Sequence, residues 1–107
     1  MAHPEPLAFP MRHKTAQEIV HRQAADSANV IIGNHARDRM LERGISDIEV
    51  YRVLREGEIE GEPEKTEHGE WKVKVCKRLK GNRDAGVVTI ILRDERLFVM
   101  TVEWEDI

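Results

Sequence analysis

The spacing of the apolar residues changes once along this chain, near residue 70. Before that point apolar residues recur at intervals of three and four, as on one face of an α-helix. After it they alternate with polar residues or form short β-branched runs, as in strands. Helices followed by consecutive strands indicate an α+β domain, with helices on one face of an antiparallel sheet.

The beginning of the chain holds most of its prolines. Residues 1–13 contain three of the four prolines and no periodicity, so we expect an irregular arm there and a single domain over residues 14–107. Thr15 and Glu18 form a capping-box pair, which predicts a helix over residues 15–26. The narrow apolar stripe of this helix suits packing on a sheet, or self-association into a homo-oligomer.

A short strand and two further helices are predicted next. The β-branched run at residues 30–32 indicates a strand. Asn34 is a suitable N-cap for a helix over residues 34–44, which ends at a glycine. A second capping box opens a helix over residues 46–57, which we expect to bury Ile48, Leu54 and either Tyr51 or Val50. Two helices with so short a connection form an αα-hairpin.

The rest of the chain predicts three or four antiparallel strands. We expect a short strand at residues 58–60 and longer ones at residues 71–78, 87–92 and 97–104, joined by turn-rich connectors. In the last of these strands, alternation predicts that one face enters the core: Phe98, Met100, Val102 and Trp104. The opposite face carries Thr101 and Glu103, which are candidates for an anion site, an acid or base, or a partner of a lysine.

Charge is distributed in blocks, although the net charge is only −3. Residues 58–70 contain six Glu and one Lys, whereas residues 71–83 contain six basic residues and no acid. Alternation places one row of side chains on a single face of the basic strand: Lys72, Lys74, Cys76, Arg78 and Lys80. A row of like charges destabilises a strand unless something offsets it. An anionic ligand would do so, as would the glutamates of residues 58–70 folded over the row, and lysines also protect an edge strand from aggregation.

The helix at residues 34–44 is rich in arginine. His35, Arg39 and Arg43 are four residues apart, so they form one stripe on the helix. Two guanidinium groups suit a phosphodiester. The helix macrodipole and Arg39 disfavour protonation of His35, and a neutral imidazole can act as a general base. Alternatively, the arginines form ordinary ion pairs with nearby carboxylates, those of Asp38, Glu42 or Asp47.

Several classes of protein are disfavoured by the sequence. A single cysteine, Cys76, gives no internal disulfide and no Cys-based zinc site, which fits a cytoplasmic protein. There is no phosphate-binding glycine loop, and neither His35 with Asp38 nor His68 forms a paired metal-ligand pattern, so we expect no cofactor and no metal. No apolar run approaches membrane-spanning length, and the N-terminus lacks the pattern of a secretion signal.

A longer motif carries a family resemblance. The segment His35-Ala-Arg-Asp-Arg-Met-Leu-Glu-Arg-Gly-Ile-Ser46, a Gly57-Glu-Ile ending and a final Thr101-Val strand together resemble the domain-of-unknown-function family 4258, over about residues 30–105. That family is similar to the RelE-like and barnase-like small ribonuclease toxins, whose fold is two packed helices followed by an antiparallel sheet.

The resemblance implies a metal-independent endoribonuclease of the toxin type, with RNA as substrate and a cognate antitoxin as partner. Carried over to this chain, it implies three catalytic residues on the helix, His35, Arg39 and Arg43. Substrate-binding residues would then lie on the sheet: Lys72, Lys74, Arg78 and Thr101. The alternating charge blocks leave a second hypothesis open, a non-catalytic module of the same fold that binds protein or nucleic acid.

Overall fold

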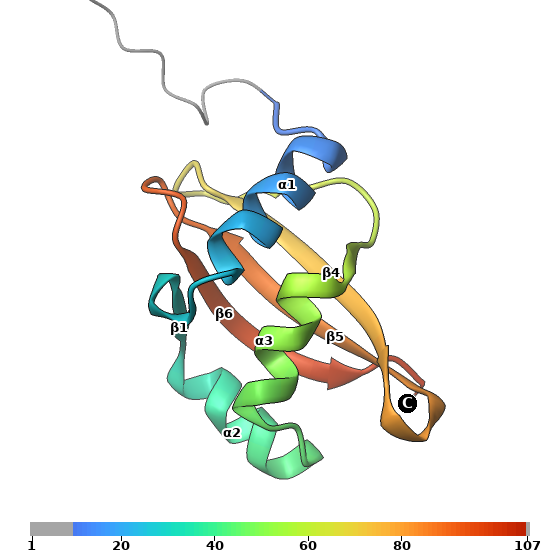
Figure 1. The fold of residues 1–107 in the computed structure, drawn as a ribbon. Coiled ribbons are helices and arrows are strands. Elements are labelled where there is room, and N and C mark those ends of the chain that lie inside the picture. Colours follow the sequence, from blue (N-terminus) through green and yellow to red (C-terminus); the bar gives the residue numbers. More distant parts are fainter. Residues whose placement is uncertain (1–9, 107) are drawn as a thin grey trace, which may run out of the picture.

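The computed structural model describes residues 10–106 and shows two helices on one face of a six-stranded sheet, with a third beside the last strand (Figure 1). Its α-helices are α1 (His13–Ala24), α2 (Asn34–Arg43) and α3 (Asp47–Glu56). Its strands are β1 (Val30–Ile32), β2 (Glu58–Ile59), β3 (Glu64–Lys65), β4 (Trp71–Leu79), β5 (Arg83–Ile91) and β6 (Leu97–Trp104). The predicted α+β class is therefore confirmed. Within residues 10–106, no helix has the length and apolarity that a membrane crossing requires.

The sheet is larger than predicted, and it is mixed. Its order is β1-β6-β5-β4-β2, and β3 also pairs with β4. The three long strands are antiparallel, as expected, but β1 runs parallel to β6 and aligns Val30 with Leu97. A parallel pair of strands needs a long connection between them. Here that connection runs from α2 through β5. Alternation alone could not identify β1 as a partner of the last strand.

Helix α1 begins earlier than the capping pattern predicted. Its N-cap is Arg12, which makes no side-chain cap, so the predicted cap at Thr15 is wrong. The predicted apolar stripe is correct, because four residues are buried: Ala16, Ile19, Val20 and Ala24. The stripe packs in the domain's own core, so it offers little apolar surface for self-association. Of the predicted irregular arm, residues 1–9 lie outside the described residues, and Met11 is already buried.

Three polar side chains, one helical turn apart, attach α1 to β2. His13 Nε2 lies 2.6 Å from the Ile59 carbonyl oxygen, and His21 Nε2 lies 2.7 Å from that of Gly57. Between them, Gln17 Oε1 accepts a hydrogen bond from the Ile59 amide at 2.8 Å. Helix α1 therefore satisfies backbone groups of Gly57 and Ile59, at the edge of the sheet where no further strand could pair with them.

The helical hairpin of α2 and α3 has the predicted turn. Gly44 has φ 69°, the left-handed conformation that favours glycine after a helix. Ser46 and Glu49 form the predicted capping box at the start of α3. The N-cap of α2, however, is Gly33 rather than Asn34, which is the first helical residue.

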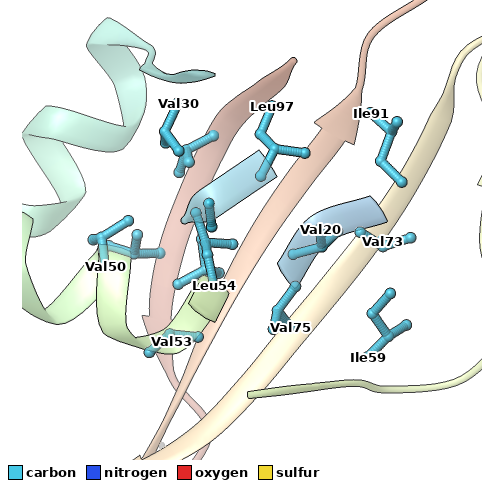
Figure 2. Packing of buried hydrophobic residues seen from close by; sticks show 14 of the residues in the cluster. Val20, Val30, Val50, Val53, Leu54, Ile59, Val73, Val75, Ile91 and Leu97 are labelled. Atoms are coloured by element: carbon cyan, nitrogen blue, oxygen red, sulfur yellow. The ribbon is translucent and has the colours of Figure 1, made fainter. Parts of the chain in front are cut away.

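The core lies between the sheet and the pair α1 and α3 (Figure 2). Helix α3 contributes Val50, Val53 and Leu54, all fully buried. The expectation that Ile48 is buried is wrong. Its side chain is 77% exposed, because the core-facing stripe of α3 starts two residues later.

A β-bulge in β6 overturns the predicted alternation of that strand. Val88 pairs with Thr101 but Thr89 pairs with Val99, so Met100 is an extra residue. Leu97 and Val99 therefore face the core before the bulge and Val102 faces it afterwards, and all three are fully buried. The predicted inward face is correct only after the bulge, because the bulge turns Phe98 and Met100 to the face without helices.

Candidate functional site

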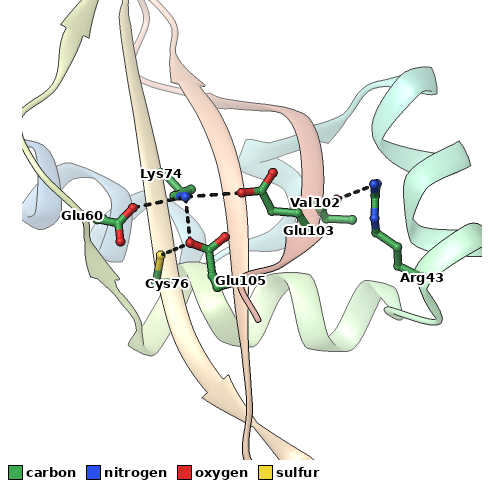
Figure 3. Close-up of polar contacts among 7 residues, drawn as sticks. All are labelled: Arg43, Glu60, Lys74, Cys76, Val102, Glu103 and Glu105. Carbon is green, nitrogen blue, oxygen red and sulfur yellow. Dashed lines mark hydrogen bonds and ion pairs between the residues drawn. The ribbon is translucent and has the colours of Figure 1, made fainter. Parts of the chain in front are cut away.

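Lys74 is the centre of a charge cluster on the helix-free face of the sheet. Its Nζ lies 2.7 Å from Glu105 Oε1, 3.1 Å from Glu60 Oε1 and 3.3 Å from Glu103 Oε2 (Figure 3). These carboxylates come from both sides of β4, from the segment after β2 and from the end of β6. Glu60 therefore offsets the basic strand as one of the glutamates of residues 58–70, an alternative left open by the sequence, and Glu103 and Glu105 add two carboxylates from outside that segment.

Lys72 and Arg78, the other predicted binding residues on β4, also have carboxylate partners. Lys72 Nζ lies 3.6 Å from Glu64 Oε1, and Arg78 Nε lies 3.0 Å from Asp84 Oδ1. Both pairs are well exposed, so each contributes little to stability. Of the basic residues predicted on this face, Lys74 has the most carboxylate partners.

Gly86 makes room for the shortest of the Lys74 contacts. Gly86 is buried in β5, paired with Cys76 on one side and Glu103 on the other. A Cβ at this position would lie only 2.5 Å from Glu105 Oε2 and 3.2 Å from the Cδ of Lys74. The absent side chain thus lets Glu105 cross β5 and reach Lys74 on β4. Glu105 Oε2 is buried there, and no hydrogen-bond donor of residues 10–106 contacts it.

The two carboxyl groups beside Lys74 have pKa values shifted in opposite directions. A hydrogen bond from Glu105 lowers the pKa of Glu103, assisted by Lys74 and by the charge of Arg43. Burial raises the pKa of Glu105, and its contact with Glu103 acts in the same direction, although Lys74 opposes both. Hydrogen bonding to Glu105 raises the pKa of Lys74, so the ammonium remains charged. Glu103 is therefore the more readily ionised carboxyl of the pair, and Glu105 binds a proton more readily than Glu103 does.

Cys76 lies next to this cluster, but its surroundings do not activate the thiol as a nucleophile. Its Sγ lies 4.0 Å from Glu105 Oε1. Burial, followed by the negative charges of Glu105 and Glu60, raises the pKa of the thiol to about 11. A thiol with such a pKa is a poor nucleophile at neutral pH.

Glu60, Cys76 and Glu105 offer three potential metal ligands within 4.8 Å of one another. The Lys74 ammonium contacts both carboxylates of this group and supplies the positive charge that a metal ion would otherwise bring. A divalent cation would have to displace it. The donor set therefore fits a lysine-centred cluster better than a metal centre.

Arg43 approaches the same cluster from the end of α2. Its Nη1 donates to the Val102 carbonyl oxygen at 3.2 Å, and its own carbonyl oxygen accepts from Trp104 Nε1 at 2.8 Å. These two bonds fix the end of α2 against β6. An open cleft of about 340 Å³ results, and its walls are Arg43, Lys74, Glu103, Trp104 and Glu105.

The remaining predicted site residues lie outside this cleft. His35 is exposed in the first turn of α2. Arg39 Nη1 forms an ion pair with Glu42 Oε1 at 2.7 Å, the ordinary pairing left open above. Thr101 shares the face of Lys74, with Val88 between them, but it does not line the cleft. Thus only Arg43 of the predicted helical stripe meets the sheet site.

The sequence prediction missed Glu105 and the role of Gly86, and it named Glu60 only as one of the glutamates of residues 58–70. A signal existed for the glycine, since a glycine at the head of a β-branched run often marks close approach by another group. Nothing in local spacing links Glu105 to Lys74, because their contact depends on strand pairing. Glu103 had been a candidate, and its contact with Lys74 matches the partner role proposed for it.

Comparison with family models gives a match to a family described as "Domain of unknown function (DUF4258)", over residues 32–104. Comparison with curated proteins and with solved structures gives no match.

Proposed function

The chain belongs to the DUF4258 family, and we propose that it is a metal-independent endoribonuclease of the toxin type, acting through the cleft between α2 and the sheet. In this proposal it acts on RNA in the cytoplasm and is restrained by a cognate antitoxin. The supporting resemblance to RelE-like and barnase-like ribonucleases rests on the sequence motif.

One observation carries the proposal. Arg43 of α2 and Lys74 of β4 line one cleft together with the ionised carboxylate of Glu103. Two cations from different elements can hold the non-bridging oxygens of a phosphodiester. Trp104 in the same wall offers an aromatic surface, although Arg83 already lies over its ring at 4.2 Å.

The residues of the cleft have suitable chemistry for RNA cleavage. Glu103 would accept the proton of a ribose 2′-hydroxyl, whose oxygen then attacks the phosphorus. The bond to the 5′ oxygen breaks, a 2′,3′-cyclic phosphate forms, and the leaving oxygen takes a proton from water. Arg43 and Lys74 would stabilise the charge that develops on the phosphoryl oxygens. The sequence-based assignment of His35 as the base is replaced in this proposal, because His35 does not line the cleft.

A second candidate function is a non-catalytic binding module. It is favoured by the three carboxylates around Lys74, which would compete with a phosphate for the ammonium. A module of this kind would bind protein or nucleic acid without cleaving it.

Incubation with a fluorogenic RNA in excess chelator tests the proposal. We expect wild-type cleavage with a cyclic phosphate product, and a loss of about a hundredfold or more with Glu103→Gln, since general base catalysis contributes that much. Arg43→Gln should cause a comparable loss, whereas Arg39→Gln, on the same helix but outside the cleft, is the matched control. Equal activity of Glu103→Gln and wild type would refute the assignment. Salt-dependent RNA binding without cleavage would favour the binding module.

A further inference from the structure

The helix-free face of the sheet carries an apolar groove away from the charge cluster. The groove has a volume of about 320 Å³, and its lining is mostly apolar on the sheet side: Ile90, Leu92, Phe98 and Met100. The segment 66–70 forms the other wall, with Thr66, Glu67, His68 and Glu70. α1 and α3 both lie on the opposite face, so neither helix covers the groove (Figure 1). No lining residue is shared with the proposed RNA cleft, so the groove is a separate surface.

The β6 bulge creates this apolar surface. It turns Phe98 and Met100 outward, and Met100 is 38% exposed. Strand pairing then aligns Phe98 between Ile90 of β5 and Ile31 of β1, which extends the apolar row across three strands. Docking a partner on this row would remove its apolar atoms from water, which is favourable.

The charge around the groove indicates the kind of partner. Glu67 and Glu70 belong to the groove wall, within the segment 58–70 that carries six Glu and one Lys. Arg93 donates to the His68 carbonyl oxygen at 2.9 Å and offsets part of this charge. The wall remains acidic, so a nucleic acid would be repelled. Two copies docked through the same surface would also bring their acidic walls together.

We propose that this groove binds a basic segment of a protein partner. A large apolar side chain of that segment sits on Phe98 and Met100, and flanking Lys or Arg side chains face Glu67 and Glu70. Apolar anchoring supplies most of the affinity in such contacts, and the charges at the edge supply selectivity and association rate. This inference does not depend on the proposed ribonuclease activity.

Selection from a phage-displayed library of random linear peptides on the immobilised full chain tests the proposal. We expect the enriched peptides to combine a large apolar residue with Lys or Arg. Binding of a synthetic enriched peptide, measured by fluorescence anisotropy, should weaken about tenfold or more with Met100→Asp, the usual effect of losing a central apolar anchor. The charge reversal Glu67→Lys with Glu70→Lys should weaken the same peptide and strengthen its acidic counterpart.

Leu41→Asp is the matched control, because Leu41 is 84% exposed on α2 and lies outside the groove. Circular dichroism shows whether each variant is folded, and Met100 is exposed enough for the charge to be tolerated. The proposal is overturned if no peptide is enriched, if enriched peptides are acidic or uncharged, or if Met100→Asp and Leu41→Asp have equal effects. Sedimentation that reveals a dimer abolished by Met100→Asp would also overturn it, since the occupant would be a second copy.

Discussion

The substitution Gly86→Ala should break the Lys74–Glu105 contact without unfolding the protein. An alanine Cβ would lie 2.5 Å from Glu105 Oε2, closer than two such atoms can approach. The atom that must move is the end of a flexible side chain, so Glu105 can swing away from Lys74 at little cost. The backbone of β5 can accept alanine, because Gly86 has no positive φ.

Two effects of similar size then oppose each other. Alanine in a strand interior is more stable than glycine by about 0.5–1 kcal/mol. A hydrogen bond between charged groups contributes about 1.5–3 kcal/mol. We reduce that figure to about 1 kcal/mol here, because the pair is partly exposed and Lys74 keeps Glu60 and Glu103 as partners. The free energy of unfolding should therefore change by less than about 1 kcal/mol, while the contact itself is lost.

A double-mutant cycle with Glu105→Ala isolates that loss. Glu105→Ala should destabilise the wild type by about 1 kcal/mol and the Gly86→Ala protein by almost nothing, a coupling of about 1 kcal/mol. Urea unfolding at neutral pH and low salt, followed by tryptophan fluorescence, is the suitable assay, because guanidinium would screen the charges. If Glu105→Ala costs the same in both backgrounds, within about 0.3 kcal/mol, Gly86 does not hold the contact in place.

Three further predictions concern the thiol, the core and α1. Cys76 should be alkylated slowly at pH 8 and faster as the pH approaches 11, because burial and nearby carboxylates raise its pKa to about 11. Glu105→Gln should lower the midpoint of this rate profile, and a midpoint near the ordinary value of 9.0 in wild type would contradict the burial argument. Leu54→Ala should lower the free energy of unfolding by about 2–5 kcal/mol, since Leu54 is fully buried, whereas the exposed Leu41→Ala should change it by less than about 0.5 kcal/mol. His21→Ala should destabilise by about 1 kcal/mol through loss of its bond to a backbone carbonyl oxygen, and an unchanged urea midpoint would show that the bond contributes nothing.

The sequence predicted the helices and strands better than it predicted which strands pair in the sheet. Alternation located β4 because Trp71, Val73 and Val75 alternate with polar residues, and the switch of period gave the α+β class. Neither signal reports which strands pair. The parallel β1–β6 pair joins residues more than sixty positions apart, so it depends on long-range packing.

The candidate site was predicted only in part for a related reason. Arg43 and Lys74 were selected from spacing, and they meet because α2 packs along β6. Glu105 was not selected, because its contact with Lys74 requires a glycine on the strand between them. The bulge at Met100 is likewise absent from any local pattern, yet it decides which side chains of β6 face the core on each side of it.

The hydrogen bonds between α1 and β2 affect how this domain can be divided experimentally. The family match begins at residue 32, after α1, and ends at residue 104, one residue before Glu105. A recombinant fragment cut at those limits would lose the packing of α1 against α3, and the backbone of Ile59 would lose its hydrogen bonds to His13 and Gln17. The segment that matches the family model thus omits α1, which is part of the packed domain in this chain. Domain transfer or fragment expression should therefore keep α1 and the residues after β6.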